Sequence, residues 1–133
     1  MIENNNIIEV GKISGEVINL LGLSLPENTS IYVGVTNIAH MAKEHSYEFN
    51  RFYDRIPQII STADYVRLKQ DDGSIEYIKS FGKYIKLAIR VAGDDNYYAR
   101  SFYFIETDRV ENLVKKGELK KKLTKSKESD IIK

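Results

Sequence analysis

The chain has 133 residues, of which 42% are hydrophobic and 29% charged, and its formal net charge is +1. These values exclude wholesale disorder and predict a single domain with one core. Cysteine is absent, which excludes disulfides and thiolate zinc sites and fits a reducing cytoplasm. No apolar run approaches about 18 residues, and residues 1–6 lack a signal pattern, so we expect a soluble, cytoplasmic protein without a membrane partner.

The near-zero net charge hides a basic C-terminal segment. Residues 115–133 hold eight lysines against Glu118, Glu128 and Asp130, which leaves the rest of the chain slightly acidic. Such a tail can add non-specific affinity for nucleic acid, or it is a solvated helix end that runs into disorder. We predict one domain over residues 1–117 and a lysine-rich tail over residues 118–133.

The first elements are a strand over residues 7–13, a short helix over 16–21 and a strand over 31–35. Ser14 is a candidate N-cap for the helix, and Gly22 is placed to end it. The strands are predicted from their β-branched and aromatic composition.

Residues 37–45 form a predicted helix that holds both histidines of the protein. His40 and Lys43 share one side of it, whereas His45 shares a side with Ile38 and Met41 and has the stronger case for packing. Two histidines five positions apart lie roughly 140° apart around a helix, so they do not chelate one metal as an i, i+4 pair would. We therefore expect no metal and no cofactor.

A second helix over residues 46–61 carries an apolar stripe that marks it as part of the core, with a kink or a fresh start near Pro57. From residue 65 the period changes to two, which predicts strands over 65–69, 75–79, 84–91 and 97–105. Short turn sequences separate these strands, so they should form an antiparallel meander. A last helix starts at Thr107 or Asp108 and extends to about residue 122, weakened by Gly117. The predicted fold is α+β: N-terminal helices packed on one face of a four-stranded antiparallel meander, with a C-terminal helix.

Alternation in the two longest strands predicts which side chains lie on the open face. That face carries four polar side chains, namely Lys86, Arg90, Ser101 and Tyr103. Ala99 and Tyr97 share the face of Ser101 in strict register. Arg100 would then fall on the apolar face, so it lies either at the edge of the sheet or in a bulge.

Cationic and hydroxyl side chains on an open sheet face suit a phosphodiester. Arginine and lysine stabilise the negative charge of a phosphoryl transition state, and hydroxyls donate hydrogen bonds to its oxygens. Histidine can accept or donate a proton near neutral pH. Two histidines would allow base and acid roles in RNA cleavage through the 2′-hydroxyl without a metal. The same pattern also fits a solvated sheet face with two surface histidines.

Four short runs carry a family resemblance: Ile-Ala-His-Met-Ala-Lys-Glu-His at 38–45, Phe-Tyr-Asp-Arg-Ile-Pro-Gln-Ile-Ile at 52–60, Ala-Asp-Tyr-Val at 63–66 and Ser-Phe-Tyr-Phe at 101–104. Over residues 7–113, the chain resembles the phage-associated nuclease domains of the barnase–EndoU–colicin–RelE superfamily. The resemblance implies a helical N-terminal part on a four-stranded antiparallel sheet. Better-known members of the superfamily are metal-independent ribonucleases, often toxins. One departure is Ala63, where the family commonly has proline, and it concerns the local turn.

The resemblance also suggests which residues do the chemistry. Five positions match the helical motif or the last strand and are the catalytic candidates: His40, Lys43, His45, Ser101 and Tyr103. The phosphate-binding candidates come from the strand pattern: Lys86, Arg90 and Arg100.

The hypothesis from the sequence is a metal-independent endoribonuclease of a phage or other mobile element. It would cleave RNA by 2′-hydroxyl attack, with His40 or His45 as general base and acid. The expected partners are RNA, with tRNA as one candidate, and a cognate inhibitor protein if the nuclease is toxin-like. The alternative is a non-catalytic RNA- or protein-binding module on the same fold. The sequence leaves the oligomeric state open.

Overall fold

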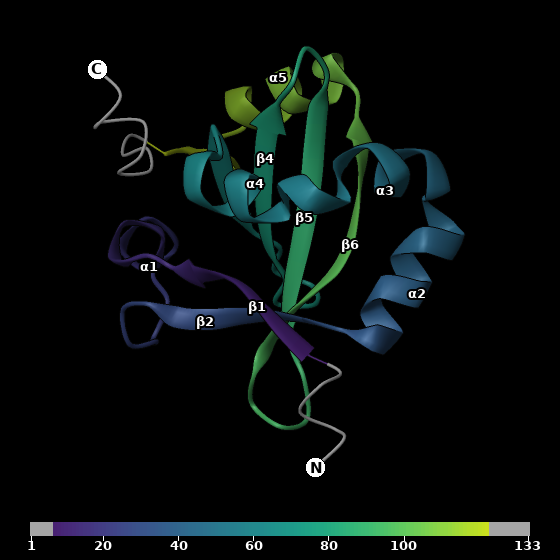
Figure 1. Ribbon diagram of the computed structural model, residues 1–133. Coiled ribbons are helices and arrows are strands. Elements are labelled where there is room, and N and C mark those ends of the chain that lie inside the picture. Colours follow the sequence, from purple (N-terminus) through teal and green to yellow (C-terminus); the bar gives the residue numbers. More distant parts are fainter. Residues whose placement is uncertain (1–6, 123–133) are drawn as a thin grey trace, which may run out of the picture.

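A seven-stranded mixed sheet organises the protein, in the order β1-β2-β6-β5-β4-β3-β7 (Figure 1). The computed structural model describes residues 7–122. The strands are β1 (Ile7–Ile13), β2 (Thr29–Gly34), β3 (Tyr65–Leu68), β4 (Ile75–Ser80), β5 (Tyr84–Val91), β6 (Tyr97–Ile105) and β7 (Lys120–Lys121). The helices are α1 (Gly15–Leu21), α2 (Val35–Glu44), α3 (Ser46–Phe52), the 3₁₀ helix η2 (Tyr53–Arg55), α4 (Ile56–Thr62) and α5 (Thr107–Lys115). None of the helices within residues 7–122 is long and apolar enough to cross a membrane.

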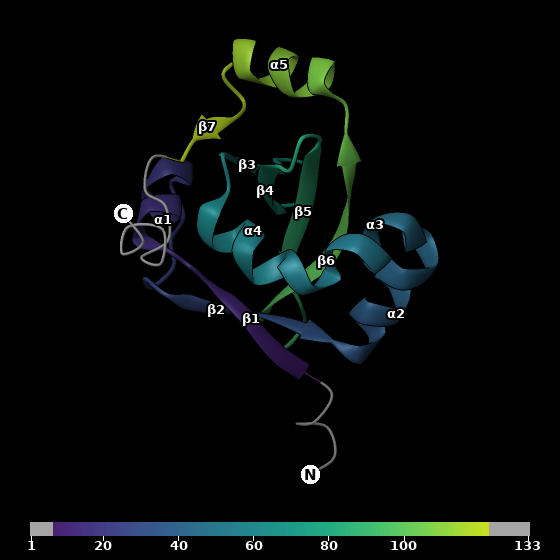
Figure 2. The same cartoon turned by 45° about the horizontal axis from the view of Figure 1, so that its top comes forward.

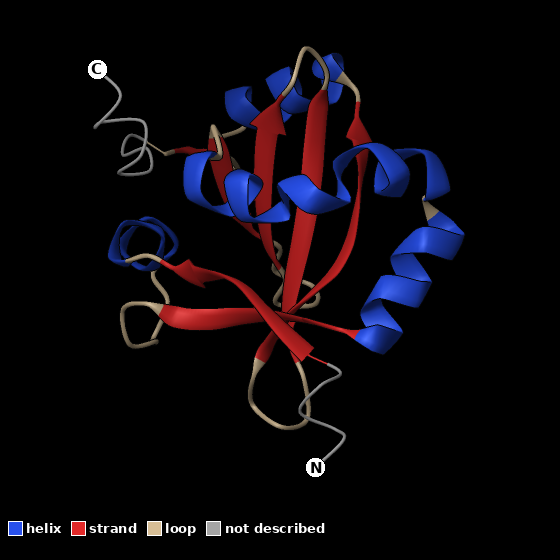
Figure 3. Ribbon diagram, viewed as in Figure 1, coloured by secondary structure: helices blue, strands red, loops and turns tan. Residues whose placement is uncertain are grey.

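The prediction of a four-stranded antiparallel sheet is wrong. Strands β3 to β6 do pair antiparallel, but β2 joins β6 in parallel through Ile31–Tyr97 and Tyr32–Tyr98. Strand β1 then extends the sheet beyond β2, and β7 extends it beyond β3. The N-terminal strands β1 and β2 therefore belong to the sheet, and only the helices of the N-terminal part pack against it (Figure 3).

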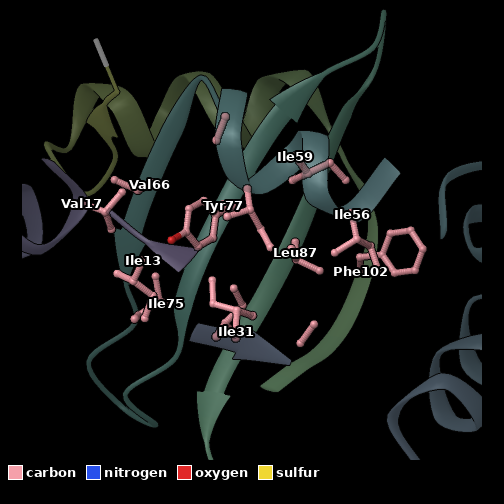
Figure 4. Packing of buried hydrophobic residues seen from close by; sticks show 14 of the residues in the cluster. Ile13, Val17, Ile31, Ile56, Ile59, Val66, Ile75, Tyr77, Leu87 and Phe102 are labelled. Carbon is pink, nitrogen blue, oxygen red and sulfur yellow. The ribbon is translucent and has the colours of Figure 1, made fainter. Parts of the chain in front are cut away.

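Strands β1 and β2 run across the central strands, so the sheet curls like half a barrel (Figure 1). The main core lies inside this curl and is closed by α4 (Figure 4). Ile13 and Ile31 come from the crossing strands, Ile56 and Ile59 come from α4, and all four are fully buried. Gly11 allows the close approach of β1 to α4, because a Cβ there would lie 2.9 Å from Cδ1 of Ile60.

Local sequence signals explain where the helices begin and end. The Ser14 hydroxyl accepts the Val17 N–H at 3.3 Å and caps α1, which ends at Gly22 with a positive φ of 66°. The predicted 46–61 helix is divided into α3, η2 and α4. Pro57 lies in the first turn of α4, where its missing N–H costs no helical hydrogen bond.

Helix α5 covers one end of the opposite sheet face, above β3 and β4 (Figure 2). There Val110 and Leu113 pack with Ile78 and Leu119 in a second apolar cluster. The predicted extension of this helix to residue 122 is wrong, because the chain turns at Gly117, with a φ of 77°, and forms β7. The predicted lysine-rich tail falls mostly on residues 123–133, outside the described part of the chain.

A bulge in β6 fixes the side chains that face the open side of the sheet. Ala88 pairs with Ser101 and Ile89 pairs with Ala99, so Arg100 is the extra residue. The bulge reverses the alternation on its N-terminal side. Ala99 is fully buried in the core, whereas Tyr98 pairs with Arg90 on the open face. The prediction that Ala99 and Tyr97 share the face of Ser101 is therefore wrong, because it assumed strict register.

Tyr77 is fully buried, and its hydroxyl has no hydrogen-bond partner among residues 7–122. An unpaired buried hydroxyl costs about 1–3 kcal/mol. We expect Tyr77→Phe to be more stable than the parent by about 1 kcal/mol in urea unfolding at pH 7, because it removes the unpaired hydroxyl.

The pH dependence of stability gives a second check on Tyr77. Burial raises the pKa of Tyr77, so the unfolded chain loses this proton near pH ~10 and the folded chain only at higher pH. The parent should therefore lose stability as pH rises above ~10, and Tyr77→Phe should lose less. If Tyr77→Phe were less stable than the parent both at pH 7 and above pH ~10, the hydroxyl would have a partner.

Candidate active-site cleft

A cleft of about 330 Å³ lies between α2 and the open face of β4, β5 and β6. Five of the eight predicted site residues line it, namely His40, Arg90, Arg100, Ser101 and Tyr103. One comes from α2 and four come from neighbouring strands, so the fold brings together residues that are far apart in the sequence.

Two interactions fix the part of helix α2 that faces the cleft. At its start, Asn37 accepts the Gly34 N–H through Oδ1 at 3.0 Å. On its inner side, Met41 is fully buried in the core. His40, the neighbour of Met41, is consequently exposed and lines the cleft.

Two cations of the cleft are held by a carboxylate in the turn after β3. The Arg90 guanidinium lies 3.3 Å from Oδ2 of Asp72, and the Lys69 ammonium lies 4.0 Å from the same atom. The Ser74 N–H donates to Oδ1 of Asp72, and this hydrogen bond, followed by the nearby cations, lowers the pKa of Asp72. These contacts are exposed, so an anionic ligand can compete for both cations.

Arg100 differs from the other cations of the cleft. Within residues 7–122 no carboxylate lies within ion-pair distance of its guanidinium. The bulge places Arg100 beside Ser101 on the open face, so a guanidinium and a hydroxyl can approach the same anion.

A buried carboxylate forms the floor of the cleft. Glu76 lies 3.1 Å from the Arg67 guanidinium and 3.3 Å from the Lys86 ammonium, and its side chain is 3% exposed. Arg67 also contacts Glu118 at 3.0 Å. Because its charge is held by Glu76, Lys86 acts first as a structural cation of the floor.

Tyr103 connects this floor to the second histidine. The Lys86 ammonium lies 4.9 Å from the centre of the Tyr103 ring. The His45 ring stacks on Tyr103, with 4.9 Å between centroids and an interplanar angle of 19°. His45 therefore supports Tyr103, and the cleft lining contains His40 alone of the two imidazoles.

The other three predicted site residues do not line the cleft. Lys86 and His45 contact Tyr103, whereas Lys43 is exposed further along α2 and does not line the cleft. Sequence reasoning missed three charged residues of the cleft: Lys69, Asp72 and Glu76. A signal existed for Glu76, because it alternates with the core residues Ile75 and Tyr77 and so shares the open face.

The fold and the cleft define a small α+β domain with a partly cationic cleft on a curled sheet. The family model described as phage-Barnase-EndoU-ColicinE5/D-RelE like nuclease3 matches residues 8–112, and the chain belongs to this family. This match confirms the resemblance found in the sequence. No curated protein and no solved structure gives a match.

Proposed function

We propose that the protein is a metal-independent endoribonuclease of a phage or other mobile element. One observation carries the proposal: the exposed His40, an arginine (Arg100) without an ion-pair partner among residues 7–122, and the hydroxyl-bearing Ser101 and Tyr103 line the same cleft. Family membership supports the nuclease class, and the RNA substrate and its chemistry are our inference.

In the proposed reaction, the neutral imidazole of His40 takes the proton of a 2′-hydroxyl. The 2′-oxygen forms a bond to phosphorus, and the bond from phosphorus to the 5′-oxygen breaks. Arg100 and Ser101 stabilise the charge that develops on the phosphoryl oxygens. Tyr103 lines the same cleft, and in the proposed reaction its hydroxyl gives its proton to the leaving 5′-oxygen. The products are a 2′,3′-cyclic phosphate and a 5′-hydroxyl, and solvent returns the proton from His40 to Tyr103.

The proposal predicts a large effect of Arg100→Ala on cleavage. Loss of one preorganised donor to a developing oxyanion costs about 10²–10³ in rate. We expect kcat/KM for RNA to fall by about that factor, with little change in the free energy of unfolding, because the Arg100 guanidinium has no ion-pair partner within residues 7–122. Lys43→Ala removes an equal charge from outside the cleft lining and is the matched control. Equal losses in both variants would point to a general effect of net charge.

The deciding experiment incubates the purified protein with single-stranded and structured RNA, including tRNA, in EDTA. End-group analysis should find 2′,3′-cyclic phosphates. Products with 3′-hydroxyl ends, or cleavage that requires added metal, would contradict the mechanism.

A binding module is the second candidate, because only one imidazole lines the cleft. It would bind RNA or a protein through the same face without cleaving it. RNA binding that weakens with added salt, survives loss of both histidines and occurs without cleavage by the parent would favour this function. If the protein does cleave RNA and acts as a toxin, we expect a cognate inhibitor protein. This inhibitor should bind over the cleft and block cleavage when it is mixed with the nuclease.

A further inference from the structure

A second hollow of about 470 Å³ opens directly beside the cleft, at the start of α2. It shares Thr36, Asn37 and Arg100 with the cleft, so the two hollows form one continuous surface. Its other walls are mainly apolar and aromatic, with Val35 and Tyr98 as the main side chains. We use the name base groove for this second hollow.

Tyr98 enters the base groove because of the bulge at Arg100. In a regular strand, Tyr98 would face the core, but here it pairs with Arg90 on the open face. Its hydroxyl donates to Oδ2 of Asp94 at 2.8 Å, and this hydrogen bond is the main cause of a raised pKa of Tyr98. The ring also lies against Tyr32, with 6.0 Å between centroids. The ring is thus held in place before any ligand binds.

The apolar surface of the base groove lies beside the Arg100 guanidinium. Val35 is 54% exposed, which leaves a large aliphatic side chain in contact with water at the rim. An apolar hollow would not by itself indicate a ligand, but this groove leads to the Arg100 guanidinium, which has no ion-pair partner within residues 7–122. A flat aromatic ring attached to a phosphate matches both features, because its faces can stack on apolar and aromatic side chains, and a nucleotide is such a ligand.

We propose that the base groove binds the nucleobase next to the phosphate held in the cleft, with Tyr98 as its stacking partner. Arg100 lies at the junction and contacts the phosphate that joins the two subsites. The proposal rests on the proposed function, because it requires a nucleic-acid strand in the cleft. It adds that the enzyme selects its cleavage position through a base at this groove.

The test uses 2′-deoxy dinucleotides, which lack the hydroxyl needed for cleavage and therefore report binding alone. Each is compared with an analogue that lacks one base, and binding is followed by NMR chemical shifts. Stacking of one base on an aromatic side chain corresponds to roughly a tenfold gain in affinity. The parent should bind one intact dinucleotide about tenfold more tightly than its abasic analogue, with shifts at Tyr98 and Val35.

Three variants separate stacking from folding. Tyr98→Ala should remove the preference for the intact dinucleotide. Tyr98→Phe, which keeps the ring and loses only the hydrogen bond to Asp94, should retain it. Tyr47→Ala removes an exposed tyrosine of α3 that lines neither hollow, and it should leave the preference for the intact dinucleotide unchanged.

The outcomes distinguish the two proposals. Base-dependent binding without RNA cleavage would support the base groove and refute the enzyme. Cleavage by the parent with an unchanged base preference in Tyr98→Ala would overturn the base groove alone. Equal binding of intact and abasic ligands by the parent, or shifts confined to other surfaces, would overturn it as well, even if Tyr98→Ala failed to fold.

Discussion

Replacing His40 by alanine is expected to abolish RNA cleavage and to leave the fold unchanged. A general base contributes typically 10²–10⁴ in rate, and His40 is the one imidazole that lines the cleft. The side chain is exposed, and within residues 7–122 it makes no hydrogen bond or ion pair. The thermal transition of His40→Ala should therefore match that of the parent.

Two variants on neighbouring positions make the His40 experiment interpretable. Lys43→Ala changes an exposed residue of the same helix and should retain parental cleavage. His45→Ala removes the ring that stacks on Tyr103, so it should lower both the thermal transition and the rate. If His40→Ala were as active as Lys43→Ala, His40 would have no catalytic role. If His40→Ala unfolded at a much lower temperature, a packing role would explain its loss of activity.

The largest expected effect on stability comes from Glu76→Gln. Glu76 is 3% exposed at its side chain, and it neutralises Lys86 and Arg67, which are 12% and 15% exposed. Removing one partner of a buried ion pair costs about 3–5 kcal/mol, because the remaining charge stays buried without compensation. Arg67 keeps Glu118, so Lys86 is the cation most affected. We expect the free energy of unfolding to fall by about 3 kcal/mol in urea titrations.

Asp72→Asn is the matched control for Glu76→Gln. Asp72 also lines the cleft and pairs with a cation, but its ion pairs with Arg90 and Lys69 are exposed, and such pairs are worth about 1 kcal/mol or less. A further change, Lys86→Met in the Glu76→Gln background, removes the uncompensated charge and should restore part of the loss. Similar losses for Glu76→Gln and Asp72→Asn would mean that burial of the ion pair is unimportant.

The sequence predicted local elements well because their signals are local. Ser14 and Gly22 mark α1, and a period of two marks the strands from residue 65 onward. The sheet itself was predicted wrongly, because pairing between Ile31 and Tyr97 depends on segments that lie far apart in the chain. No periodicity in either segment specifies its partner.

The candidate site was predictable to the extent that strand alternation held. Arg90, Ser101 and Tyr103 line the cleft as their alternation predicts. Tyr98 was missed because the bulge reverses the alternation. The arginine at position 100 was the available clue, since a bulge was one of the two explanations for it. His40 and Lys43 share a helix side by spacing, but the position of α2 along β6 decides that only His40 reaches the cleft.

The parallel pairing of β2 with β6 has a consequence for the order in which the protein acquires its site. His40 is made before Arg100 to Tyr103, which follow it by 60 to 63 residues in the chain. The two paired positions of β2 and β6, Ile31–Tyr97 and Tyr32–Tyr98, join the N-terminal hairpin to the meander. A nascent chain that stops before β6 has the imidazole without the residues that would hold a phosphate. The cleft therefore forms only after β6 has been made, and neither half of the described chain contains it alone.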